Sequence, residues 1–216
     1  MVYEVQSERL ITHMKGIGRL KSKDIEESLR NIKRHNFVPE KAHDMAYEDM
    51  PLSIGKDQTI SQPSTVVVMT EALDVKLGDN ILEIGTGSGW QAAILARLTG
   101  STGKVYTVEI IPELAESARK NLTKQKSLNV KLICGDGSIG LEKYAPYDRI
   151  IVTAACPEIP KPLLEQLKVG GIMVIPVGNV YLQKMNIVKK TEKGIEKEEI
   201  GSFMFVPLRG KLGFKE

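Results

Sequence analysis

One stretch near the middle of the chain constrains the fold more than any other: Asn80-Ile81-Leu82-Glu83-Ile84-Gly85-Thr86-Gly87-Ser88-Gly89-Trp90-Gln91. A short apolar run typical of a buried strand leads into three glycines at alternate positions, and good helix formers with helical spacing follow. Glycine has no Cβ, so the turn can adopt positive φ and a ligand can lie against its backbone. The stretch therefore predicts a strand, a tight turn and a helix whose N-terminal N–H groups favour an anionic ligand.

The glycine spacing alone leaves two interpretations open. The pattern differs from the dinucleotide fingerprint Gly-x-Gly-x-x-Gly because Ser88 is followed at once by the third glycine, one position early. The turn could also need glycine only for its geometry. A second observation favours a nucleoside site, because a β-branched run that starts at Lys104 ends at Glu109, 24 residues beyond Gly85. An acid at the end of the second strand, about 20 residues after the glycines, can bind both hydroxyls of a ribose.

Length and composition are those of an ordinary globular protein. The 216 residues are 42% hydrophobic and 26% charged, and they suffice for a buried core. The formal net charge of +3 is too small to indicate a nucleic-acid groove. No run approaches the ~18 apolar residues of a membrane span, and the N-terminus lacks the apolar core of a signal peptide. We expect a cytoplasmic protein without a nucleic-acid or membrane partner.

The cysteines and histidines do not indicate a metal site. Cys134 and Cys156 each end a predicted buried strand and have neither metal-ligand spacing nor a CxxC pattern, so we expect buried, reduced thiols. His13, His35 and His43 lie in polar helical surroundings without a repeated ligand spacing, so we expect surface histidines.

Residues 1–77 predict an N-terminal helical extension followed by a substrate loop. Residues 3–45 have largely helical spacing, with Ser22 as the cap of a second helix. Residues 49–63 are polar, rich in turn formers and too long for an ordinary connector. The loop ends at Pro63, before a helix predicted over residues 64–73. Ser61 and Gln62 therefore lie at a helix entrance, where they could cap the helix or line a binding site.

From Gly78 onward, strand and helix patterns alternate. The predicted strands span residues 81–84, 105–109, 130–134, 149–153 and 172–176, and the predicted helices span residues 91–98, 112–125 and 160–167. Strands separated by such helices imply right-handed βαβ units, and thus a doubly wound α/β fold with a mostly parallel sheet. Ligands in these sheets bind at the carboxyl ends of the strands, near the topological switch point. Residues 78–216 are therefore the predicted ligand-binding domain.

Another carboxylate follows the third predicted strand. Gly135-Asp136-Gly137 stands after this strand as the glycine turn stands after the first. Asp136 could accept a hydrogen bond from an exocyclic amine such as that of adenine. It could equally belong to a plain Asp-Gly turn.

The end of the chain has a different pattern. Residues 181–190 and 195–205 flank Thr191-Glu192-Lys193-Gly194, which predicts an antiparallel hairpin with a glycine turn. A parallel sheet that closes with a hairpin points away from nicotinamide dehydrogenases and toward the methyltransferase version of the doubly wound fold.

With these residues identified, the chain resembles the protein-L-isoaspartate O-methyltransferases, a family that uses S-adenosylmethionine. Residues 82–93 resemble its first motif, including the aromatic Trp90 and the amide Gln91 after the third glycine. Thr59-Ile60-Ser61-Gln62-Pro63 resembles its signature loop, and Phe205-Val206-Pro207-Leu208 its closing segment. The resemblance implies a mostly parallel, seven-stranded sheet of the S-adenosylmethionine-dependent methyltransferase type, with a C-terminal antiparallel hairpin and an N-terminal helical extension.

The resemblance also implies a set of site residues. Glu83 and the three glycines would line the methionine part of the cofactor, Glu109 would hold its ribose, and Asp136 would lie by the adenine. The full cofactor set is Glu83, Gly85, Thr86, Gly87, Ser88, Gly89, Glu109, Ile110, Gly135, Asp136 and Gly137. Ser61 would be the catalytic serine, in a substrate set of Thr59, Ile60, Ser61, Gln62, Val206 and Leu208. Arg209 departs from the family pattern, which places a small hydroxyl residue there, and could attract an anionic substrate.

The implied reaction is methyl transfer to the free carboxylate of L-isoaspartyl residues in damaged proteins and peptides, and the sequence leaves open whether D-aspartyl residues are also accepted. This carboxylate is ionised at neutral pH, so the reaction needs no strong general base. Residues 152–157 are small and mostly apolar, and they offer little on which a flipped base could stack. Two alternatives remain: a methyltransferase acting on RNA or a small molecule, and a non-enzymatic nucleoside-binding module. We expect a monomer, whose partners are the damaged polypeptides.

Overall fold

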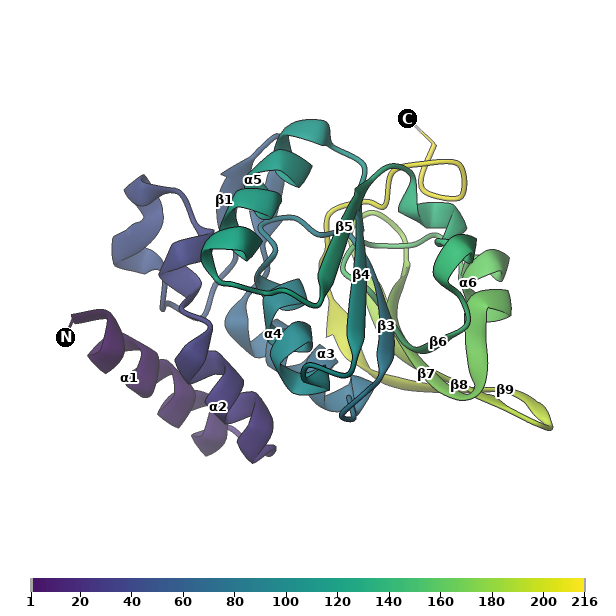
Figure 1. Cartoon of the computed structure of the whole chain (residues 1–216), viewed down its shortest axis with the longest axis horizontal. Helices are drawn as coiled ribbons and strands as arrows, with labels where there is room; N and C mark the ends of the chain where they lie inside the picture. Colours follow the sequence, from purple (N-terminus) through teal and green to yellow (C-terminus); the bar gives the residue numbers. More distant parts are fainter. Residues whose placement is uncertain (1, 216) are drawn as a thin grey trace.

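A seven-stranded sheet forms the centre of the molecule in the computed structural model, which describes residues 2–215 (Figure 1). Its strand order is β5-β4-β3-β6-β7-β8-β9. The first five strands in this order, β5 to β7, run parallel to one another. β8 and β9 are antiparallel and close the sheet as a hairpin. The strands are β3 (Asn80–Ile84), β4 (Lys104–Glu109), β5 (Val130–Cys134), β6 (Tyr147–Val152), β7 (Leu167–Gly178), β8 (Gln183–Thr191) and β9 (Gly194–Phe203). The predicted fold class is confirmed.

Alternating side chains explain why both faces of the sheet are covered. On β6, Ile151 packs into one hydrophobic core, and its neighbours Ile150 and Val152 pack into another on the opposite face. The first core joins the sheet to α3 (Pro63–Leu73) and α4 (Trp90–Thr99), and the second contains Leu163 of α6 (Lys161–Gln166). The remaining helix of the sheet domain, α5 (Pro112–Lys124), contacts β4 and β5.

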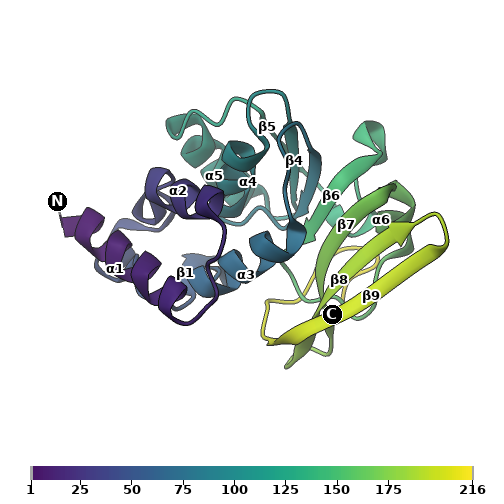
Figure 2. The same cartoon turned by 90° about the horizontal axis from the view of Figure 1, so that it is seen from below.

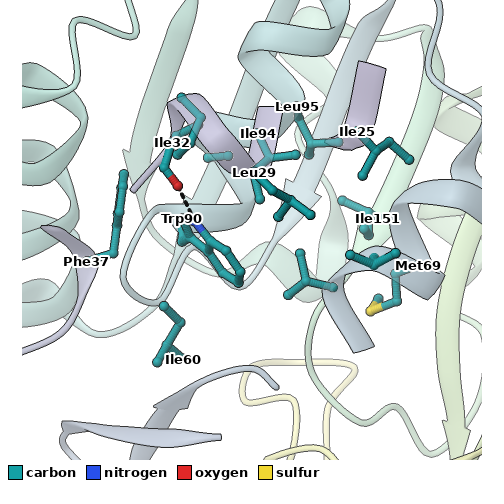
Figure 3. Close-up of a cluster of buried hydrophobic side chains, with 14 of the residues drawn as sticks. Ile25, Leu29, Ile32, Phe37, Ile60, Met69, Trp90, Ile94, Leu95 and Ile151 are labelled. Atoms are coloured by element: carbon teal, nitrogen blue, oxygen red, sulfur yellow. Dashed lines mark hydrogen bonds between the residues drawn. The ribbon is translucent and has the colours of Figure 1, made fainter. Parts of the chain in front are cut away.

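The N-terminal extension packs on the outside of α4. It contains α1 (Val2–Gly16), α2 (Lys23–Asn31) and the 3-10 helices η1 (Arg34–Phe37) and η2 (Glu40–Met45), and Figure 2 shows α1 and α2 set apart from the sheet. Ser22 caps α2 as predicted, because its hydroxyl accepts a hydrogen bond of 3.4 Å from the Ile25 N–H. Apolar side chains of α2 meet those of α4 in the first core (Figure 3). The extension and the sheet therefore share one core.

The sheet has its topological switch point beside β3. The chain proceeds from β3 outward to β4 and β5, and then crosses to β6 on the other side of β3. The segments that leave the carboxyl ends of β3 and β6 consequently diverge and leave space between them. The glycine turn lies at this point, immediately after Ile84.

Residues 49–63 were predicted to be a loop without strands, and this prediction is wrong in one respect. The segment contains a short antiparallel hairpin. Strands β1 (Leu52–Gly55) and β2 (Gln58–Ile60) pair through Leu52 and Ile60, both buried. Lys56 and Asp57 connect the strands with φ of 55° and 56°. Such a turn usually contains Asn-Gly or Asp-Gly, so Lys-Asp gives little hairpin signal in the sequence.

Two other predictions about side chains need correction. Cys134 is exposed rather than buried, because β5 is the edge strand of the sheet. Cys156 is buried as predicted, and burial raises the pKa of its thiol to about 12. His35 is half-buried, since it stacks on Tyr3 with the ring centroids 4.1 Å apart and its Nδ1 lies 2.8 Å from the Tyr47 hydroxyl.

Residues 2–215 contain neither a candidate metal-binding cluster nor a candidate membrane-spanning helix. No group of three or more His, Cys, Asp or Glu side chains is placed to hold a metal ion. No helix in this part of the chain is long and apolar enough to cross a membrane.

Candidate functional site

The glycine turn between β3 and α4 has a backbone that only glycine adopts without strain. Gly85 has φ of +93°, and a Cβ there would collide with the Thr153 hydroxyl, which donates a 2.6 Å hydrogen bond to the Gly85 carbonyl. Gly87 has φ of +53°, and its Cα faces the β1–β2 hairpin. Gly89 packs against Ala118 and Leu122 of α5. The turn is thus fixed from behind by β6 and α5, and its Gly87 side is open to the hairpin.

Glu109 is held against this turn, as its sequence spacing predicts. One carboxylate oxygen accepts a 2.8 Å hydrogen bond from the Gly87 N–H, and the other accepts a 3.0 Å bond from the Ile111 N–H. The residue is only 5% exposed. Each carboxylate oxygen has a second lone pair that can accept a hydrogen bond from a ligand. The geometry suits a ligand that presents hydroxyl groups beside the turn.

A pocket at the carboxyl edge of the sheet brings together predicted residues from distant parts of the chain. The hairpin, the glycine turn, the end of β4 and the segment after β9 all contribute to its lining. Of the predicted site residues, those in the lining are Thr59, Ile60, Ser61, Gly85, Thr86, Gly87, Ser88, Glu109, Ile110, Gly137, Val206 and Leu208. The two halves of the predicted site, for cofactor and for substrate, therefore share one pocket.

The other predicted residues lie outside the lining. Asp136 is engaged by the backbone, because one carboxylate oxygen accepts from the Ser138 N–H and the other from the Lys211 N–H, each at 2.8 Å. Gly135 donates its N–H to the Glu109 carbonyl at 2.8 Å. Gly89 and Gln62 face α5 and Asp49 respectively, and Glu83 is buried behind the pocket wall. A direct role for these residues in binding stays a prediction.

Glu83 lies behind the pocket wall in a fully buried hydrogen-bonded chain. The Thr107 hydroxyl donates a 2.5 Å hydrogen bond to one oxygen of Glu83 and lies 2.6 Å from the hydroxyl of Thr86, which lines the pocket. The other oxygen of Glu83 has no hydrogen-bond partner among the described residues. Burial raises the pKa of Glu83 to about 8; the Thr107 hydrogen bond opposes the rise and the Glu109 charge adds to it. Burial therefore favours the neutral, protonated form of this side chain.

Asp49, rather than Ser61, supplies the side-chain hydrogen bond at the start of α3. Asp49 accepts the hydrogen bond of the Ser64 N–H at 2.8 Å, and its other oxygen accepts from the Gln62 amide at 3.2 Å. Gln62 makes no cap of its own at the helix start. The sequence did not single out Asp49 for this role, because it stands 15 residues before Ser64. The capping interpretation of Ser61 and Gln62 is thus not needed to explain the helix.

Several lining residues were not predicted. Thr153 and Ala154 line the pocket and directly follow β6, just as the glycine turn directly follows β3. Their place at the carboxyl end of a predicted parallel strand was the sequence signal that could have identified them. Val66 and Met69 of α3 are apolar lining residues that were also not predicted. The segment after β9 adds the exposed Arg209, which the sequence had suggested as a residue that could attract an anionic substrate. The ion pair of Lys56 with Glu113 ties the tip of the hairpin to the first turn of α5.

Comparison with known proteins identifies the family. The family model described as protein-L-isoaspartate(D-aspartate) O-methyltransferase matches residues 5–213. The chain belongs to this family. A protein-L-isoaspartate O-methyltransferase of Methanopyrus kandleri is 49% identical over 217 residues, covering 100% of this chain and 96% of its own. One from Archaeoglobus fulgidus, protein-L-isoaspartate O-methyltransferase 2, is 51% identical and covers 100% of this chain and 98% of its own.

One solved structure agrees with this family assignment, and a second agrees with the fold. A structure of a protein-L-isoaspartate O-methyltransferase superposes with a TM-score of 0.88 at 31% identity, covering 96% of this chain and 67% of that one. A putative family member from Plasmodium falciparum, solved with S-adenosyl-L-homocysteine, has a TM-score of 0.83 at 24% identity, with 93% and 97% coverage. The second structure shows that the fold of this chain matches that of the Plasmodium falciparum protein.

Proposed function

We propose that the protein transfers a methyl group from S-adenosylmethionine to the free carboxylate of L-isoaspartyl residues, and also of D-aspartyl residues, in damaged proteins and peptides. The observation that carries the proposal is the shared pocket, in which Ser61 and the Gly85–Gly87 turn line one cavity of a chain that belongs to this family. A separate nucleoside-binding module would not need the Ser61 segment in its pocket.

The residues of the pocket fit this cofactor. The backbone at Gly85 and Gly87 is free of Cβ atoms, so the methionine part can lie against it. Glu109 would hold the ribose hydroxyls through the lone pairs that its two backbone bonds leave free. Ile110 and Gly137 line the same pocket and would complete the cofactor side. When bound, the cofactor supplies an electrophilic methyl group on a sulfonium.

The chain contributes mainly by positioning the acceptor. An isoaspartyl carboxylate is ionised at neutral pH, and no histidine is among the residues described in the lining. Displacement requires the reacting atoms to be held about 3–3.5 Å apart and in line. Ser61 would donate a hydrogen bond that orients the acceptor oxygen. Val206 and Leu208 would shield the acceptor from water, and Arg209 would attract its negative charge.

We also propose how the two parts of the chain divide the activity, and where and on what the protein acts. Residues 1–77 would provide the acceptor loop and residues 78–216 the cofactor site. The chain would act as a monomer in the cytoplasm on polypeptides rather than on nucleic acid, in keeping with a net charge of only +3. Gel filtration with light scattering would test the monomer.

Paired peptides provide the direct test of the substrate. The protein is incubated with methyl-labelled S-adenosylmethionine and two peptides that differ only in Asp or isoAsp at one position. We expect alkali-labile label in the isoAsp peptide and almost none in the Asp peptide, because only the isomerised linkage presents the free carboxylate in the required place. Equal labelling of both peptides, or label only in added RNA, would contradict the proposal.

Removing the Ser61 hydroxyl tests the orienting hydrogen bond. We expect Ser61→Ala to lower kcat/KM for the isoAsp peptide by about 10- to 100-fold, because a misaligned acceptor loses much of the advantage of positioning. Affinity for S-adenosylhomocysteine, measured by calorimetry, should stay unchanged. Ser202→Ala, at an exposed position of β9, is the control and should keep full activity. Full activity of Ser61→Ala would remove Ser61 from the mechanism.

A further inference from the structure

Arg34 is a buried cation in the N-terminal extension, away from the sheet domain in sequence. It lies in η1 and is only 1% exposed. Its guanidinium donates three hydrogen bonds to backbone carbonyls: 2.6 Å to Ala46, 3.0 Å to Met50 and 3.1 Å to Ser61. The last acceptor is the carbonyl of the proposed catalytic serine.

Two of these three carbonyls, those of Met50 and Ser61, lie at the base of the β1–β2 hairpin. Met50 precedes β1 and Ser61 follows β2, so the guanidinium joins the two ends of the hairpin segment. The bond to Ala46 ties both ends to the end of η2. Asp49 also holds this segment, because it accepts hydrogen bonds from the Ser64 N–H and the Gln62 amide. The position of Ser61 is therefore fixed by a charged group of the extension rather than by the hairpin alone.

Arg34 also contacts the residue that follows the glycine turn. Its guanidinium carbon lies 5.3 Å from the ring centre of Trp90, the first residue of α4. The indole N–H of Trp90 donates a 3.1 Å hydrogen bond to the Ile32 carbonyl, drawn in Figure 3. In the same view Phe37 and Ile60 lie beside the indole. The Arg34 side chain thus joins the Ser61 segment to the first residue of α4.

Burying a guanidinium is costly, and burial lowers the pKa of Arg34 to about 10. An apolar side chain of similar length would pack in the same place without this cost. It could not bridge the carbonyls of Met50 and Ser61 or stack on Trp90 as a planar cation.

We propose that Arg34 is a positioning residue that sets the distance and orientation of Ser61 relative to the glycine turn. The inference rests on the proposed role of Ser61 and extends it to a residue that does not line the pocket. In this arrangement the extension does more than cover α4, because it determines where the acceptor is presented.

The test compares Arg34→Met and Arg34→Lys with a matched control. The control is Arg149→Met, which removes a second buried arginine that also donates to backbone carbonyls, those of Asp74 and Asp148. Each variant is assayed at a temperature below the start of its own unfolding transition. We expect both Arg34 variants to lower kcat/KM for the isoAsp peptide by about 10- to 100-fold, with affinity for S-adenosylhomocysteine within about 2-fold of wild type.

The control separates positioning from stability. Arg149→Met should lower the thermal midpoint while keeping kcat/KM, since Arg149 lies at the amino end of β6, far from Ser61 in the fold. Arg34→Lys retains the charge and most of the stem, so it supplies the measurement if Arg34→Met does not fold. Wild-type kcat/KM in a folded Arg34 variant would overturn the proposal, and so would an equal loss in Arg149→Met.

A double variant distinguishes this proposal from the one on which it rests. If Arg34 acts through Ser61, Arg34→Lys combined with Ser61→Ala should be no less active than Ser61→Ala alone. Losses that multiply would overturn the role of Arg34 and leave Ser61 in place. If Ser61→Ala by itself is fully active, the proposed role of Ser61 fails, whatever Arg34→Lys does.

Discussion

Replacing Gly87 by valine should abolish binding of S-adenosylhomocysteine and leave the chain folded. A Cβ at Gly87 would lie 3.6 Å from the Ile54 side chain and 4.0 Å from the Thr59 carbonyl, which are ordinary contact distances. The protein can therefore accommodate the first carbon, but the branched methyl groups would extend into the pocket that Gly87 lines. The φ of +53° adds strain of about 1–2 kcal/mol for a residue with a Cβ. We expect at least a 100-fold rise in Kd, measured by calorimetry.

Gly170→Val is the matched control for this experiment. Gly170 has φ of +83° and no heavy atom within 4 Å of a built Cβ, so valine there carries similar backbone strain outside the pocket. Both variants should lose some thermal stability. Only Gly87→Val should lose binding. If Gly87→Val binds the product as wild type does, the glycine turn is not the cofactor site.

The parts of the fold that the sequence predicts are those with a strong local signal. The apolar run before Gly85, and the distance in sequence from Gly85 to Glu109, predict a ligand site at the ends of two strands. In the structure the glycine turn and Glu109 are joined by a hydrogen bond from the Gly87 N–H. Hydrophobic runs bounded by turns likewise predict the five parallel strands. In each case the residues that act together are close in sequence, or are placed at one sheet edge by the parallel topology.

The parts that were missed depend on contacts between distant residues. Asp49 caps a helix that begins 14 residues later, and Arg34 reaches the Ser61 carbonyl across 27 residues. Neither contact has a periodic pattern from which it could be predicted. Cys134 ends an apolar run and looks buried, but whether a strand is central or at an edge is decided by the strand order. Part of the pocket lining is thus predictable from the sequence, whereas the residues that hold this lining in place, Asp49 and Arg34, are not.

Glu83 should make the protein less stable as the pH rises from about 4.5 to about 8. Its pKa is raised by burial from an ordinary 4.5 to about 8, so in this interval the unfolded state has lost a proton that the folded state keeps. Stability falls with pH wherever the folded state binds more protons. Each unit of pKa difference corresponds to about 1.36 kcal/mol, so the fall amounts to a few kcal/mol of the free energy of unfolding. Below pH 4.5 both states are protonated and the contribution is constant.

Glu83→Gln should remove this part of the pH dependence. The amide oxygen can still accept the hydrogen bond of the Thr107 hydroxyl, but the side chain no longer titrates. Urea unfolding between pH 5 and pH 8.5 should therefore show the variant gaining a few kcal/mol on the wild type as the pH rises. In the variant, the amide NH₂ occupies the position of the Glu83 oxygen that has no hydrogen-bond partner among the described residues. Any cost in stability from this placement is the same at every pH, so it does not change the difference in pH dependence between variant and wild type. Glu116→Gln, at an exposed position of α5, should leave the profile unchanged. Parallel profiles for wild type and Glu83→Gln would show that Glu83 is ionised in the folded protein, and the buried chain through Thr107 to Thr86 would then end in a charge rather than in a neutral acid.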